Sequence, residues 1–190
     1  MFSHRPPATA LAALVALSMI LGAAVLADAP APQQATLLLR ILAFDRKLAA
    51  RAAGSVTVAI IYKEGTARSE TAMSQLAAAL EEAARKNTVA GLPVKVARVP
   101  FSAHLEADLQ GASAAYLCPG LEDSLSAIVR ATQARKALTF SSSEEYLAEG
   151  TSIALVTRET KLAIVVNLPN SRGEGADLDS NLLRIAEVIR

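Results

Sequence analysis

The stretch SVTVAIIY at residues 55–62 decides the fold. It is apolar and rich in β-branched residues, it is too short for a typical helix, and Gly54 and the polar run KEGT at 63–66 bound it. A run of this kind is typical of a strand that is covered on both faces, as in a parallel sheet. An amphipathic helical pattern at 69–86 and a second strand-like run at 94–99 follow it. Together these segments predict a β-α-β unit, to which the rest of the chain adds layers.

The flanking patterns extend this unit in both directions. Before it, residues 35–44 have the spacing of a helix with one buried stripe. After it, the patterns predict a short helix at 101–110, a strand at 114–117, a helix from residue 121, a strand at 137–140 and a small helix at 144–148. Strand-like runs at 152–157 and 162–168 are separated only by RETK, which forces an antiparallel hairpin.

The end of the chain reads as a glycine-containing loop at 169–176 and a last helix from residue 177 or 179 to 190. The predicted inward face of that helix includes Leu182, Leu183 and Ile189. The whole pattern predicts an α/β fold: a three-layer α/β/α sandwich with a mixed, mainly parallel sheet, a C-terminal antiparallel hairpin and a closing helix.

The first 27 residues have the features of a secretory signal peptide. Arg5 precedes an uncharged, largely apolar run at 8–25, and small residues provide cleavage options at 25–27 and 27–29. The same run is long enough for a retained membrane anchor, and this alternative stays open. We predict a signal peptide at 1–27, a flexible leader at 28–34 and a single domain at 35–190, located in the periplasm and without membrane insertion after cleavage.

Composition excludes some classes of function. The chain has 19 basic and 18 acidic side chains and no basic stripe interleaved with aromatic residues, which argues against a nucleic-acid partner. Cys118 is the only cysteine in the sequence, so no disulfide forms within the chain and burial of apolar side chains must stabilise it.

The loops after the parallel strands are the candidate ligand site, because open α/β sheets bind ligands at the carboxyl ends of their strands. Backbone N–H groups and serine hydroxyls there would suit an anion. The same residues are also ordinary turn and capping residues in every α/β domain, and this alternative is the simpler one. The candidate residues are Tyr62, Lys63, Glu64, Cys118, Pro119, Gly120, Ser141, Ser142 and Ser143.

Motifs for catalysis are missing from the sequence. Cys118 would precede a helix, a position that can lower a thiol pKa, but His104 lies in a different loop. The run GEG at 173–175 lacks the third glycine of a dinucleotide-binding loop, and DLDSN at 177–181 lacks the glycine and glutamate of a calcium loop. We therefore predict no enzyme, no catalytic residue, no cofactor and no metal site.

The C-terminal third resembles the YfiR-like family of exported bacterial proteins. The resemblance rests on residues 146–150, on the hairpin that ends in Asn167, and on the closing run ADLDSNLLRIA at 176–186. The upstream order, from the helix at 37–48 through the strand at Val56, fits as well. Two features depart from the family pattern: there is no second cysteine to pair with Cys118, and residues 39–46 contain no tryptophan.

The resemblance implies a periplasmic α/β protein that is often a homodimer. The best-understood kind of member represses a membrane-bound diguanylate cyclase, and so acts in cyclic di-GMP signalling, by binding the periplasmic sensor domain of that enzyme. We therefore expect a non-catalytic regulatory protein that acts through protein–protein contact, with an inner-membrane signalling protein as its partner. The alternative is a periplasmic module that binds a small ligand with its strand-end loops. Redox control through paired cysteines is not expected here.

Overall fold

The computed structural model describes residues 29–159 and 161–190. The predicted signal peptide at 1–27, and the alternative of a retained anchor, lie outside these residues. Within the described ranges, no helix combines the length and the apolar character needed to cross a membrane.

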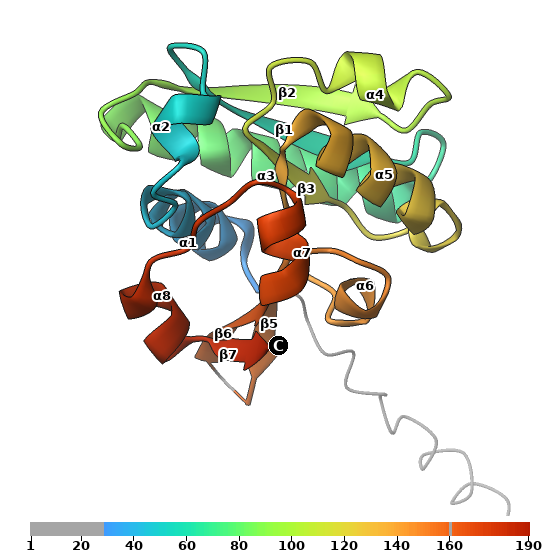
Figure 1. Cartoon of the computed structure of the whole chain (residues 1–190). Helices are drawn as coiled ribbons and strands as arrows, with labels where there is room; N and C mark the ends of the chain where they lie inside the picture. The colour runs from blue at the N-terminus through green and yellow to red at the C-terminus, as the bar shows by residue number, and fades with distance from the viewer. Residues whose placement is uncertain (1–28, 160) are drawn as a thin grey trace, which may run out of the picture.

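A seven-stranded sheet forms the centre of the molecule, in the order β2-β1-β3-β4-β5-β6-β7 (Figure 1). All neighbouring strands run parallel except β5 and β6, which form the predicted antiparallel hairpin. The mixed, mainly parallel α/β sheet predicted from the sequence is thus confirmed. The strands are β1 (Val56–Tyr62), β2 (Val94–Pro100), β3 (Ala114–Leu117), β4 (Leu138–Ser141), β5 (Ile153–Arg158), β6 (Lys161–Asn167) and β7 (Glu187–Ile189).

Eight α-helices and one short 3-10 helix connect and cover the strands within the described residues. The α-helices are α1 (Ala31–Ala43), α2 (Leu48–Arg51), α3 (Ala67–Lys86), α4 (Leu105–Asp108), α5 (Leu125–Arg135), α6 (Glu145–Ala148), α7 (Leu168–Gly173) and α8 (Ser180–Ile185). The 3-10 helix (Glu122–Ser124) leads into α5. The first helix begins four residues before the predicted start at residue 35, so most of the predicted leader at 28–34 is helical.

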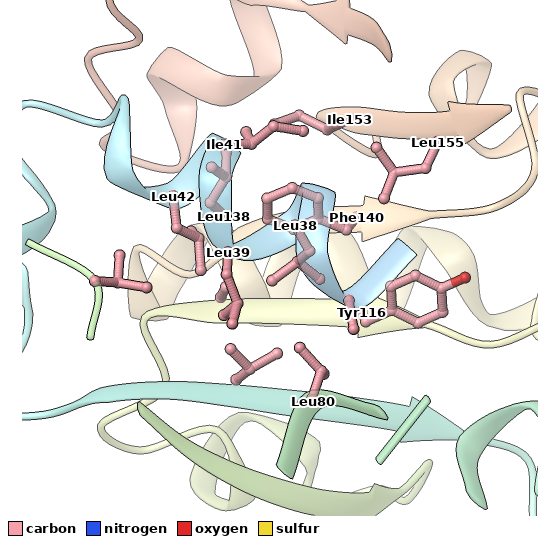
Figure 2. Packing of buried hydrophobic residues seen from close by; sticks show 14 of the residues in the cluster. Leu38, Leu39, Ile41, Leu42, Leu80, Tyr116, Leu138, Phe140, Ile153 and Leu155 are labelled. Atoms are coloured by element: carbon pink, nitrogen blue, oxygen red, sulfur yellow. The ribbon is translucent and has the colours of Figure 1, made fainter. Parts of the chain in front are cut away.

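The two faces of the sheet carry separate cores, because successive side chains of a strand point to opposite sides. From β1, Val58 and Ile60 face the core beneath α1 and α3, whereas Ile61 faces the core beneath α4 and α5. Figure 2 shows the first core, where side chains of α1 meet Tyr116 and Phe140 from the neighbouring strands. Helices therefore pack on both faces of the sheet, as the three-layer prediction requires.

The C-terminal segment differs from its prediction in detail. The closing helix is present as α8 but ends at Ile185, and Ala186 is already extended. Residues Glu187 to Ile189 form β7 instead, paired with β6 from Val165 to Asn167. Apolar residues at 182, 183, 186 and 189 satisfy a helical period, but the open edge of β6 offers backbone partners to the β-branched pair Val188-Ile189.

The predicted loop at 169–176 differs as well, because α7 begins at Leu168, the last residue of the predicted strand, and occupies the loop up to Gly173. The Asn167 side chain accepts a hydrogen bond from the backbone N–H of Asn170 (3.2 Å) and so caps the helix. Pro169 stands in the first turn, where its missing N–H costs nothing. The sequence LPNSRG has the composition of a turn, and the short helix depends on this cap.

Candidate functional site

A cleft lies at the carboxyl ends of β3, β4 and β5, with a volume of about 500 Å³. We call it the strand-end cleft. The loop after β3, the loop between β4 and α6, the end of β5 and the first turn of α3 contribute its walls. Its lining residues are Ala29, Arg68, Pro119, Glu122, Ser142, Ser143, Glu144, Glu145, Tyr146, Leu155, Val156, Thr157 and Arg158.

Three of the sequence-predicted site residues line this cleft: Pro119, Ser142 and Ser143. Two others lie beneath it. The Ser141 hydroxyl is buried and donates to the carbonyl oxygen of Ser143 (2.7 Å), which holds the loop after β4 in place. The thiol of Cys118 is fully buried, and burial raises its pKa to about 12. At neutral pH Cys118 is therefore a protonated core residue, and its role is packing.

The other predicted residues stand beside the cleft and do not line it. Lys63 and Glu64 are exposed in the turn after β1, and Tyr62 is half-buried at the end of that strand. Gly120 has a φ of +93°, and a Cβ there would come within 3.4 Å of the Thr66 methyl group. This close approach keeps the loop after β3 against the loop after β1.

The sequence-predicted site residues include none of the charged residues of the cleft: Arg68, Glu122, Glu144, Glu145 and Arg158. Apart from the adjacent pair Glu144-Glu145 they come from separate parts of the chain, and no spacing in the sequence brings these parts together. The carboxyl end of β5 is also part of the cleft, and the sequence does not predict this. Because β5 pairs in parallel with β4, its end lies at the same edge of the sheet as the ends of β3 and β4. Only this register could have indicated Arg158.

Arg158 forms the most extensive ionic contact of the cleft. Its two terminal nitrogens donate to the two carboxylate oxygens of Glu144 (2.7 and 2.8 Å), and Nη2 also donates to Glu187 on β7 (3.1 Å). The hydrogen bonds from Arg158 hold the pKa of Glu144 below its usual value. All three side chains are partly exposed to water, so the contact fixes geometry more than it adds stability. It links the cleft to the last strand of the sheet.

Tyr146 orders the opposite wall. Its hydroxyl donates to Glu122 (2.9 Å) and accepts from the backbone N–H of Leu121 (3.1 Å), which joins α6 to the loop after β3. Burial opposes ionisation of Glu122, but hydrogen bonds from its own backbone, from Tyr146 and from Gly120, together with the charge of Arg68, outweigh burial and lower its pKa. Burial also raises the pKa of Tyr146 to about 12. At neutral pH the wall thus presents a carboxylate held by a neutral phenol.

The chemistry of this lining suits reversible binding of a small polar molecule. It combines hydroxyl groups, guanidinium groups and carboxylates, and its volume lies in the usual range of roughly 300–1,000 Å³ for ligand sites. Among residues 29–159 and 161–190, no group of three or more histidine, cysteine, aspartate or glutamate side chains is arranged to hold a metal ion.

Comparison with known protein families identifies the family of this domain. The profile of the YfiR/HmsC-like proteins matches residues 32–187, which is most of the chain. The chain belongs to the YfiR/HmsC-like family. This confirms the resemblance that the C-terminal motifs indicate. Within the family motif, the asparagine at the end of β6 is the α7 cap described above, so the motif has a structural role. The comparison with curated proteins gives no significant match.

Solved structures share the fold of this YfiR/HmsC-like chain at low sequence identity. One is the ABC domain of a Streptococcus pneumoniae protein in complex with L-Trp (TM-score 0.60, 15% identity, 84% of this chain and 60% of that chain). A conserved domain protein from Vibrio cholerae gives a TM-score of 0.61 at 14% identity, and the match covers 85% of this chain and 60% of that chain. A substrate-binding protein with adhesive properties from Clostridium difficile, in its ligand-free, open structure, gives a TM-score of 0.54 at 15% identity. This match covers 76% of this chain and 57% of that chain. The chain thus spans about 60% of the length of these proteins, and the likeness concerns the fold alone.

Proposed function

We propose that this protein is an exported, non-catalytic regulator that acts through protein–protein contact and restrains a membrane-bound signalling enzyme such as a diguanylate cyclase. The observation that carries the proposal is the YfiR/HmsC-like match over residues 32–187, because it spans the sheet, both helical layers and the strand-end cleft. The signal-peptide features of residues 1–27 support export to the periplasm, where the sensor domain of such an enzyme would be accessible.

The C-terminal edge of the sheet supports a surface for such a contact. Ile185 at the end of α8 is 69% exposed and Ile189 on β7 is 45% exposed. Exposed large apolar side chains on an edge strand are typical of protein interaction sites, and an unprotected edge is otherwise a hazard for aggregation. The opposite edge strand, β2, carries exposed Lys95 and Arg98, which protect it.

Affinity capture from solubilised membranes tests this proposal, followed by reconstitution with the purified periplasmic domain of the captured enzyme. We expect a direct complex, and we expect Ile185→Asp to weaken it at least tenfold. Ala103→Asp, at an exposed position beside the opposite edge, is the matched control and should bind as the wild type does. Failure of every membrane signalling enzyme to form a direct complex would contradict the proposal.

A second candidate function is binding of a small ligand in the strand-end cleft. The cleft lies at the carboxyl ends of parallel strands, where open α/β sheets bind their ligands. Two proteins that share the fold are described as a substrate-binding protein and as a domain in complex with L-Trp, which is consistent with this candidate. The two functions are compatible, since a ligand could control the contact with the partner.

A further inference from the structure

We propose that the strand-end cleft binds a small zwitterion, a molecule of amino-acid size that carries one carboxylate and one ammonium group. The proposal rests on the second candidate function, ligand binding in the cleft, and names its ligand class. It follows from the charges of the cleft and from hydroxyl groups that have no partner among the described residues.

The charges of the lining are of both signs. Two arginines and three glutamates face the same cavity of about 500 Å³. A purely anionic ligand would meet Glu122, Glu144 and Glu145, and a purely cationic ligand would meet the two guanidinium groups. Either would leave charges of its own sign close by, which disfavours binding. A ligand with one charge of each sign can match both sets.

For each charged group of the ligand, the cleft offers side chains that can form further hydrogen bonds or ion pairs. The Nη1 group of Arg158 makes one hydrogen bond, to Glu144, so its second N–H can donate to a ligand carboxylate. The hydroxyls of Ser142, Ser143 and Thr157 make no side-chain hydrogen bond within the described part of the chain and can add donors. For the ammonium group, Glu145 is an exposed carboxylate that forms no ion pair with any described residue.

Occupancy of the cleft would also reach the C-terminal edge. Arg158 joins Glu144 in the cleft wall to Glu187 on β7, and β7 carries the exposed Ile189. A ligand carboxylate that accepts the second Nη1 N–H of Arg158 adds a third anionic partner to the guanidinium group that already holds both glutamates. Binding of the zwitterion is therefore expected to change the hydrogen exchange of β7, the strand that supports the proposed contact surface.

Titration calorimetry on the purified protein tests the ligand class with two matched sets of probes. The first contains L-phenylalanine, phenethylamine, which lacks the carboxylate, and 3-phenylpropanoate, which lacks the ammonium group. The second contains L-leucine, 3-methylbutylamine and 4-methylpentanoate. We expect at least one amino acid to bind with a Kd below 1 mM and its two truncated analogues to bind at least tenfold more weakly. If neither amino acid binds with a Kd below 1 mM, or if an analogue binds as tightly, the proposal is overturned.

Two variants test which residues bind the carboxylate and the ammonium group of the ligand. Arg158→Gln and Glu145→Gln should each weaken the amino acid at least tenfold, whereas Arg172→Gln and Glu149→Gln, exposed and outside the cleft, should not. Unchanged melting temperatures show that the variants fold, and unchanged affinity in both cleft variants would overturn the assignment. Hydrogen exchange at residues 187–189 should change on binding in the wild type and not in Arg158→Gln, and an unchanged β7 would overturn the coupling. No partner is present in these experiments, so their failure is separate from a failure of partner capture.

Discussion

At the scale of single residues, Glu174 has the most unusual environment. Its carboxylate is fully buried and accepts hydrogen bonds from the backbone N–H and the hydroxyl of Thr139 (both 2.8 Å), from Ser152 and from Thr132 (3.2 Å). Burial raises its pKa to about 7, although these hydrogen bonds lower it. Glu174 lies near the starts of β4 and β5, at the end of the sheet opposite the strand-end cleft, and it ties the segment after α7 to both strands.

The protonation of Glu174 makes stability depend on pH. The folded-state pKa is raised above the ordinary value of 4.5, so the stabilisation is complete below about pH 4.5 and is lost as pH rises through about 7. We expect the Glu174→Gln variant to lose less stability than the wild type between pH 5 and pH 8, by about 2–3 kcal/mol. Urea denaturation at both pH values measures this. Glu149→Gln, at an exposed position, should keep the wild-type slope, and an equal slope in Glu174→Gln would contradict the assignment.

Residue by residue, the sequence predicted the backbone frame of the candidate site better than its charges. Pro119, Ser142 and Ser143 follow directly after predicted strands, so their place at one edge of the sheet follows from the parallel topology. The presence of Arg68 and Arg158 in the cleft depends on the register of α3 and of the hairpin. Register is set by tertiary packing, which a single sequence does not reveal.

At the scale of elements, Asn167 connects three of them. It ends β6, its side-chain oxygen caps α7, and its side-chain nitrogen donates to the Leu147 carbonyl of α6 (3.3 Å). We expect Asn167→Ala to lower the free energy of unfolding by about 1–2 kcal/mol, because both hydrogen bonds are lost. Asn167→Asp keeps the capping oxygen and should lose less. Chemical denaturation of both variants measures the difference, and an equal loss in the two would show that the cap contributes nothing.

The short closing helix gives a second prediction at this scale. Leu182 is 1% exposed and belongs to the core beneath α1, whereas Ile185 in the same helix points to solvent. We expect Leu182→Ala to cost about 2–5 kcal/mol, because it leaves a cavity. Ile185→Ala should change stability by less than about 0.5 kcal/mol, because it empties no buried space. Thermal or urea unfolding compares the two, and similar losses would mean that α8 is not packed as described.

The helical period of the last segment predicts a helix up to residue 190, but the structure changes to a strand after Ala186. It placed Leu182, Leu183 and Ile189 on one buried face, and the structure buries Leu182 fully, Leu183 partly and Ile189 least. Periodicity indicates which residues are apolar but not where a helix gives way to a strand. That change depends on β6, whose free edge accepts Glu187 to Ile189.

At the scale of the whole molecule, the segment that follows α1 is joined to the segment that precedes α8. Arg46 donates its backbone N–H to Asp177 (3.0 Å), and Asp179 donates its own to Phe44 (2.9 Å). The buried Asp45 accepts from the backbone N–H of Asp177 (2.9 Å) and pairs with Arg51. The C-terminal segment is thus held by the N-terminal helices as well as by β6. The sequence indicated the layers and the hairpin through local patterns, but contacts between residues this far apart leave no local pattern.

The regulatory role is the central claim, and the level of cyclic di-GMP in the source bacterium tests it most directly. Deleting the gene should raise cyclic di-GMP, because the restrained cyclase is released. The intact gene should restore the low level, while a version that lacks residues 2–27 should not, because the protein would stay apart from the periplasmic sensor domain. A level that deletion leaves unchanged, or that the leaderless version restores, would contradict the account.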